Sequence, residues 1–152
     1  MDWDITFLKI AELFAEHSTC QRLSVGAVIV KDKRVISCGY NGVPKGMKHC
    51  NEIFTKEYVC TPEGRIKHHD FSSKYELHAE QNCIAYALKS GAVIDDTCTI
   101  YITTEPCMDC AKLIAASGIK NVVFKNIYER SSEGRDFLKS AGVSIRQLKI
   151  EE

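Results

Sequence analysis

Apolar residues recur in the first part of the chain with two different periods. Near the N-terminus the spacing is three and four residues, which predicts a helix over residues 5–17 with Asp4 as its N-cap. The apolar positions expected to be buried are Phe7, Leu8, Ala11, Phe14 and Ala15. Two β-branched runs, residues 25–30 and 35–40, flank a charged turn and therefore predict a β-hairpin.

The second half of the chain alternates between helical and strand-like patterns. Helix formers followed by a glycine predict helices over residues 79–90 and 106–117, and a third helix is expected over residues 133–140. The strands expected here occupy residues 99–103, 121–124 and 143–148. Strands that alternate with helices after a hairpin imply an α/β fold in which helices cover both faces of a mixed sheet.

Residues 41–75 do not follow this rhythm, because their apolar positions show little periodicity. A structureless segment of about 35 residues is unusual inside a compact domain unless it has a function or is held by a staple. The segment contains four residues with metal-binding side chains, Cys50, Cys60, His68 and His69. We find no internal repeat or inter-domain linker, and residues 1–152 are expected to form one domain.

Composition narrows the range of partners and environments. Lys plus Arg and Asp plus Glu each total 20, so no excess of positive charge favours a nucleic acid, and a small anionic substrate is preferred. No signal peptide and no apolar run approaching a membrane span is present, which predicts a soluble cytoplasmic protein without a membrane partner. In such a protein, eight cysteines favour reduced thiols, some of them metal ligands, over disulfides.

Two short motifs stand at the start of two predicted helices. They are His78-Ala79-Glu80 and Pro106-Cys107-Met108-Asp109-Cys110, which together form the H-x-E and P-C-x-x-C pair of zinc deaminases. Cys107 and Cys110 lie three positions apart at a helix start, so one metal ion can bind both thiolates, and His78 supplies a third ligand. Alone, C-x-x-C is also typical of a redox pair or of half of a structural zinc site. A lone histidine at a helix start is also typical of a helix cap.

The arrangement of three ligands predicts a catalytic zinc ion rather than a structural one. Three protein ligands leave the fourth tetrahedral position for water, whose pKa zinc lowers toward neutrality. Hydrolytic deamination needs attack by hydroxide, protonation of a ring nitrogen and departure of ammonia. Glu80, two residues from His78, is therefore predicted to be the general acid and base.

These motifs resemble those of the cytidine/deoxycytidylate deaminase superfamily, and the resemblance covers nearly the whole chain. The run Gly-Tyr-Asn-Gly-Val-Pro-Lys-Gly over residues 39–46 is similar to the G-Y-N-G-x-P-x-G segment of dCMP deaminases. The resemblance implies a three-layer, cytidine deaminase-like fold with a central five-stranded mixed sheet. It also implies zinc-dependent conversion of dCMP to dUMP and ammonia, which supplies dUMP for dTMP synthesis, by a homohexamer.

The resemblance extends to substrate-binding residues. It implies that Asn41 bonds the sugar hydroxyl, that the Ala79 backbone N–H reads the pyrimidine carbonyl, and that Tyr128 is an aromatic gate over the pocket. Asn-Gly is also an ordinary turn, and a single tyrosine after a strand also serves packing. Arg22, a forked donor before the first strand, is a candidate for the substrate phosphate, although some relatives lack an arginine there.

A second, structural zinc ion is implied by the pattern of some phage-type and bacterial dCMP deaminases. Its ligands would be Cys20, Cys50, His68 and Glu76, and it would order the irregular segment. Cys60 and His69 are alternative ligands, or the cysteines are free thiols. The remaining cysteines, Cys38, Cys83 and Cys98, are expected to be small buried residues.

Nucleotide regulation is also implied by the resemblance. Such enzymes are activated by dCTP with Mg²⁺ and inhibited by dTTP, and the regulatory segment corresponds here to Gly39, Tyr40, Asn41, Gly42 and Lys45. The sequence leaves dCTP open as an additional substrate. Two other functions compete: a tRNA adenosine deaminase, which needs a basic surface, and a dNTP-sensing protein with a deaminase fold, which does not need Glu80.

Overall fold

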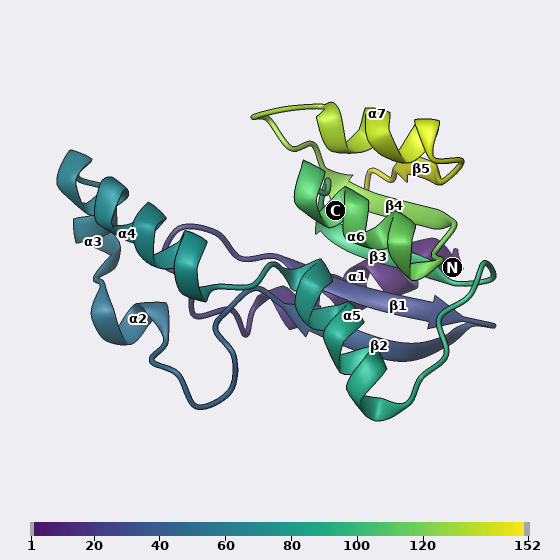
Figure 1. The fold of residues 1–152 in the computed structure, drawn as a ribbon, viewed down its shortest axis with the longest axis horizontal. Coiled ribbons are helices and arrows are strands. Elements are labelled where there is room, and N and C mark those ends of the chain that lie inside the picture. Colours follow the sequence, from purple (N-terminus) through teal and green to yellow (C-terminus); the bar gives the residue numbers. More distant parts are fainter. Residues whose placement is uncertain (1, 151–152) are drawn as a thin grey trace.

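The computed structural model describes residues 2–150 and contains a five-stranded sheet with helices on both faces (Figure 1). The elements are α1 Trp3–Ala15, β1 Gly26–Lys31, β2 Arg34–Tyr40, α2 Cys50–Ile53, α3 Lys56–Val59, α4 Pro62–Tyr75, α5 Ala79–Ser90, β3 Thr99–Thr104, α6 Met108–Ser117, β4 Asn121–Asn126, α7 Glu133–Ser140 and β5 Ser144–Gln147. The strand order is β2-β1-β3-β4-β5, in which β1 runs antiparallel to both neighbours and β3, β4 and β5 are parallel.

Two apolar clusters, one on each face of the sheet, produce three layers. On one face α1 packs Phe7, Leu8 and Ala11 against Val28 and neighbouring strand residues. On the other face, α5, α6 and α7 contribute to a larger cluster around the central strands. A strand between two layers must be apolar at consecutive positions, which is why β1 reads as an uninterrupted apolar run. The predicted three-layer α/β fold with a five-stranded mixed sheet is confirmed.

Helix ends place the two motifs at one edge of the sheet. The glycines predicted to end α5 and α6, Gly91 and Gly118, adopt left-handed conformations with φ of 78° and 94°. His78 is the N-cap of α5 and Cys107 the N-cap of α6. The prediction that α6 begins at Pro106 was wrong by two residues, because Cys107 has extended backbone angles.

The N-cap prediction for the first helix was also wrong. The helix begins at Trp3, and Asp2 caps it by accepting a hydrogen bond from the Asp4 backbone N–H at 2.9 Å. The Asp4 carboxylate instead accepts a hydrogen bond from the Tyr101 hydroxyl at 2.5 Å and pairs with Arg146. Asp4 therefore ties α1 to β3 and β5, a long-range role that sequence spacing does not reveal.

The segment 41–75 is not structureless, because it contains α2, α3 and α4. Local capping explains how α4 forms without an amphipathic pattern: Pro62 opens it, and the Thr61 hydroxyl accepts a hydrogen bond from the Gly64 N–H at 3.0 Å. The helix packs on α3 and extends away from the sheet (Figure 1), so it needs no long apolar stripe. Within residues 2–150, no helix combines the length and apolar character needed to cross a membrane.

A direct backbone contact fixes α1 on the sheet. A Cβ atom added at Gly26 of β1 would lie 1.9 Å from the Ala11 carbonyl oxygen and 2.7 Å from the Ala15 nitrogen. Gly26→Ala should therefore lower the free energy of unfolding by about 3 kcal/mol, measured by urea denaturation. Gly42→Ala is the matched control, because its Cβ meets no atom within 4 Å, and its change should stay within about 0.5 kcal/mol. Equal losses in both variants would contradict the contact.

Candidate active site and metal centres

Three side chains from α5 and α6 converge where the two helices begin. The Nδ1 atom of His78 lies 3.2 Å from the Cys110 sulfur and 3.5 Å from the Cys107 sulfur, and the three donor atoms are all within 4.8 Å of one another. Tetrahedral zinc with ordinary bond lengths separates a nitrogen and a sulfur ligand by about 3.6 Å. The donor set and its spacing therefore fit one zinc ion.

The electrostatics of this cluster favour a cation. Hydrogen bonding to Cys110 lowers the pKa of Cys107 to about 4, aided by the neighbouring His78. The same hydrogen bond, together with burial, raises the pKa of Cys110. Hydrogen bonding to Cys107 raises the pKa of His78. The protein's own groups thus stabilise one thiolate at the start of α6, and a divalent cation would stabilise the second.

Glu80 lies in the first turn of α5 and is 4% exposed. Burial raises the pKa of its carboxyl group above the usual value, a shift that favours the protonated form during part of a proton-transfer cycle. Glu80 lines the same pocket as His78 and Cys107, and it does not belong to the three-donor cluster. A buried carboxyl beside the ligands and free to titrate is the arrangement that proton transfer requires.

The pocket has a volume of about 850 Å³ and contains the residues predicted to bind substrate. Its lining includes Arg22, Asn41, Ala79 and Tyr128. Asn41 is buried, with its Oδ1 accepting from the Val25 N–H at 2.9 Å and its Nδ2 donating to the Leu23 carbonyl at 2.8 Å. The Asn41 amide therefore also holds the loop before β1 in place.

Residues of the predicted regulatory segment are spread over several environments. Gly39 packs so closely on α5 that an added Cβ would lie 2.8 Å from the Ala79 carbonyl. Gly42 exchanges backbone hydrogen bonds of 3.0 and 2.9 Å with Leu77, whereas Tyr40 and Lys45 are exposed. Among the five, Asn41 alone lines the pocket that the described residues form. Gly39 and Gly42 therefore have structural roles whatever nucleotide the segment binds.

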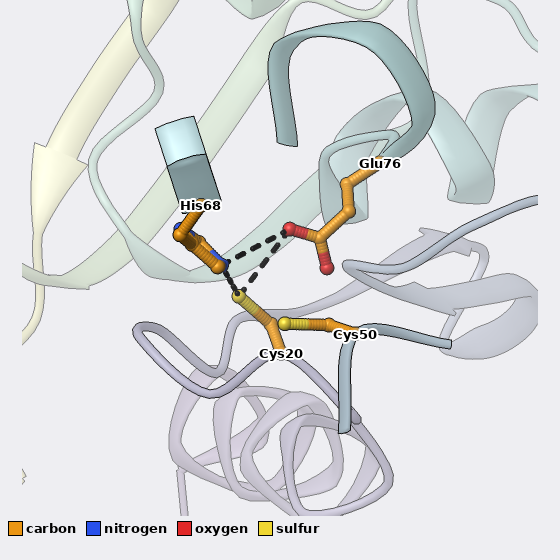
Figure 2. Close-up of side chains that lie close together, drawn as sticks. All are labelled: Cys20, Cys50, His68 and Glu76. Atoms are coloured by element: carbon orange, nitrogen blue, oxygen red, sulfur yellow. Dashed lines mark hydrogen bonds and ion pairs between the residues drawn. The ribbon is translucent and has the colours of Figure 1, made fainter. Parts of the chain in front are cut away.

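A second cluster joins residues distant in the sequence (Figure 2). The Cys20 sulfur lies 3.5 Å from His68 Nε2 and 3.4 Å from Glu76 Oε1, and His68 Nε2 lies 3.7 Å from the same oxygen. Cys50 completes a set of four donors that all lie within 4.8 Å of one another. The two distances from the Cys20 sulfur match the separations of about 3.4–3.6 Å between ligands of tetrahedral zinc, and the distance between His68 and Glu76 is slightly longer.

Unsatisfied groups support a cation in the second cluster as well. Glu76 Oε2 is buried and has no hydrogen-bond partner, a costly condition for a carboxylate. Burial raises the pKa of Cys20 to about 12 and also raises that of Cys50, while it lowers the pKa of His68, which favours the neutral imidazole. A divalent cation would offset the cost of both thiolates and satisfy the orphaned oxygen.

Other candidate residues lie outside both clusters. Neither Cys60, which is exposed, nor His69, which lines the same pocket as His68, is among the four donors of the second cluster. Cys83 and Cys98 are fully buried as expected, but Cys38 is only partly buried.

Glu105 is a site residue that the sequence analysis missed. It is 2% exposed, lines the pocket and precedes Pro106 and Cys107. Its carboxylate pairs with Arg135 of α7, at 2.5 Å from Oε2 to Nε. The only signal in the sequence is an acidic residue between an apolar strand and the Pro-Cys motif, which does not identify the partner.

Comparisons with known proteins agree with this geometry. Residues 1–126 match the family model described as the cytidine and deoxycytidylate deaminase zinc-binding region. The chain is 37% identical to the deoxycytidylate deaminase of Enterobacteria phage T2, over 92% of this chain and 89% of that protein. It is also 37% identical to ComE operon protein 2 of Bacillus subtilis, over 100% of this chain and 74% of that protein.

A solved structure shares both fold and sequence with this chain. The dCMP deaminase of cyanophage S-TIM5, crystallised with dCMP and dUMP, superposes with a TM-score of 0.78 and 34% identity. The match covers 97% of this chain and 99% of that one. Together with the two His/Cys clusters, these similarities indicate a zinc-binding protein.

Metal analysis tests the two clusters. We expect two zinc ions per purified chain, one for each cluster. Cys50→Ser should lower the content to one, because serine is a poor zinc ligand and the remaining second-cluster donors are then three. Cys60→Ser is the matched control and should retain both ions, since Cys60 lies outside the clusters. Loss of an ion from Cys60→Ser, or two ions in Cys50→Ser, would contradict the ligand assignment.

Proposed function

The chain belongs to the cytidine and deoxycytidylate deaminase family, and on that premise we propose that it hydrolyses dCMP to dUMP and ammonia. One observation carries the proposal: the buried carboxyl of Glu80 opens onto the same pocket as a three-donor zinc site. Relatives named deoxycytidylate deaminases support the choice of dCMP, as does the cyanophage structure with dCMP and dUMP.

The chemistry divides between a zinc ion and the protein. Zinc held by His78, Cys107 and Cys110 supplies the Lewis acidity that makes water a nucleophile near neutral pH. Glu80 accepts one proton from the attacking water and delivers it to the ring nitrogen. It then accepts the proton of the newly added hydroxyl group and delivers it to the amino group, which leaves as ammonia. Water and dCMP are thus converted to dUMP and ammonia, and the carboxyl returns to its starting state.

Pocket residues support an orientation for the nucleotide. We assign the pyrimidine carbonyl to the Ala79 backbone N–H at the start of α5, and the sugar hydroxyl to Asn41. Each polar atom of Asn41 already has a backbone partner, so one lone pair and one hydrogen remain for a ligand. Tyr128 forms part of the wall, and Arg22 serves the phosphate with the guanidinium hydrogens that its bond to the Val59 carbonyl leaves free.

Regulation and assembly belong to the same proposal. We propose activation by dCTP with Mg²⁺ and inhibition by dTTP, acting on the segment that contains Gly39, Tyr40, Gly42 and Lys45, in a cytoplasmic homohexamer. The backbone pairing of Gly42 with Leu77 supports a link to the active site, because Leu77 directly precedes His78. A nucleotide that moves Gly42 would move the segment that leads to this zinc ligand.

The competing functions are less well supported. A tRNA adenosine deaminase needs excess basic charge, whereas acidic and basic residues are equal in number here. A dNTP sensor without turnover would not need Glu80 buried beside three zinc donors. An assay of ammonia release from dCMP, dCTP, cytidine and a tRNA stem-loop separates these functions. We expect dCMP to be the preferred substrate, and the same assay tests whether dCTP is an additional one.

Glu80→Gln should abolish ammonia release from dCMP, because an amide cannot transfer the protons, while zinc content stays unchanged. A loss of at least about a hundredfold in kcat is expected for removal of a general acid and base. Glu129→Gln is the control, since it changes an exposed carboxylate that lines the same pocket. Turnover that survives in Glu80→Gln would disprove the assigned role.

Arg22→Gln should raise the KM for dCMP by about tenfold and leave the KM for deoxycytidine unchanged, because only dCMP carries the phosphate. Steady-state kinetics with both substrates measure the difference. Arg34→Gln is the matched control, as Arg34 bonds the Asp32 carbonyl in the turn between β1 and β2. If KM rises equally for the two substrates, Arg22 supports the fold of the pocket and does not bind phosphate.

A further inference from the structure

We propose that the Glu105–Arg135 ion pair is a positioning device. It holds the part of the pocket wall that contains Tyr128 against the turn that contains the zinc ligand Cys107. The role in substrate binding rests on the proposed function, whereas the positioning itself follows from contacts among Glu105, Tyr128 and α7. Neither Glu105 nor Arg135 belongs to the zinc clusters.

The Glu105 carboxylate has a defined partner on each oxygen. Oε2 accepts from Arg135 Nε at 2.5 Å, and Oε1 accepts from Arg135 Nη2 and from the Tyr128 backbone N–H, both at 3.3 Å. The Glu105 side chain is 1% exposed, so in this position each of these bonds replaces water. A two-pronged pair between a guanidinium and a carboxylate restricts both position and orientation more than a single hydrogen bond does.

The backbone of Glu105 is fixed as firmly as its side chain. Its N–H donates to the Asn126 carbonyl at 2.7 Å, at the end of β4. One residue thus bonds the chain on both sides of Ile127, through Asn126 and Tyr128. Glu105 is two residues from Cys107. The same residue therefore anchors the loop that contains Tyr128 (the tyrosine loop) and the turn that contains the zinc ligand Cys107.

The helix that supplies the arginine is itself pressed against the ligand turn. A Cβ added at Gly134 of α7 would lie 2.3 Å from the Pro106 carbonyl oxygen and 3.0 Å from the Cys107 carbonyl carbon. Figure 1 shows α7 alongside α6, and the two helices are in contact. Arg135, the next residue, therefore reaches Glu105 from a helix that cannot shift toward the site without a clash.

These contacts define what the pair does for the pocket. The ion pair orders the connection between β4 and α7, and Tyr128 and Arg130 of that connection line the pocket. Without the pair, the Tyr128 N–H keeps a carboxylate acceptor whose position is no longer fixed, and the pocket wall can move relative to the zinc ligands. The expected defect is in substrate binding rather than in proton transfer.

Arg135→Gln tests the proposal in the full-length, zinc-loaded protein. We expect the KM for dCMP to rise roughly tenfold, because the wall is misplaced, with kcat within about threefold and zinc content unchanged. Arg135→Lys should recover part of the loss, since it restores the charge without the fork. Tryptic cleavage after Arg130 should accelerate in Arg135→Gln, a readout that needs no substrate.

Arg146→Gln is the matched control, because Arg146 also pairs with a partly buried carboxylate, Asp4, but away from the pocket. It should lower stability without changing the KM or cleavage at Arg130. A double variant, Arg135→Gln with Tyr128→Ala, should have a KM no higher than that of Tyr128→Ala alone, since the pair acts through the tyrosine loop. Additive effects, or an unchanged KM in Arg135→Gln, would overturn the proposal.

The two proposals fail in different ways. If the unaltered protein does not convert dCMP, the proposed function is wrong, and accelerated cleavage of Arg135→Gln still supports the anchoring of the loop. If dCMP is converted and cleavage after Arg130 is the same in both proteins, the positioning role is wrong while the function stands.

Discussion

The structure buries ionisable metal-binding side chains, namely cysteine, histidine and glutamate, next to one another in two clusters. Four donors in one cluster and three in the other lie so close that their thiolate and carboxylate forms repel, and burial removes the water that would screen them. Cations resolve the conflict by attracting all the donors at once. The starts of α5 and α6, and the positions of Cys20, Cys50, His68 and Glu76, meet that requirement, while α5 and α6 also pack on the apolar core.

One short extended segment connects the two clusters. Glu76 belongs to the second cluster and His78 to the first, and both have extended backbone angles. Residues two apart in an extended chain point to the same side, so Leu77 can pair its backbone with Gly42 while its neighbours serve different clusters. The helix α4 is thereby joined to the catalytic pocket by a short extended segment whose backbone is held in place.

Local patterns in the sequence were sufficient for the sheet, its covering helices and the three-donor cluster, because those depend on periodicity and on the spacing of Cys107 and Cys110. Apolar periodicity was insufficient for α4, because this helix has no amphipathic pattern. Its start at Thr61 and Pro62 was present in the sequence but was not recognised, and its packing against α3 is set by the fold. Local patterns also missed Glu105, because its partner lies 30 residues away on a helix where arginine looks like an ordinary surface charge. Ion pairs between residues so far apart are determined by the fold, and they have no characteristic spacing in the sequence.

The contact of Gly26 with α1 has a consequence for the second cluster. Because the backbone of the last turn of α1 rests on the strand with no side chain between them, the lateral position of that helix end has almost no tolerance. Cys20 lies five residues after Ala15, so the fixed end of α1 determines where the segment that leads to Cys20 begins. The absence of a single carbon atom in β1 thus helps determine where the sulfur atom of Cys20 lies in the second cluster.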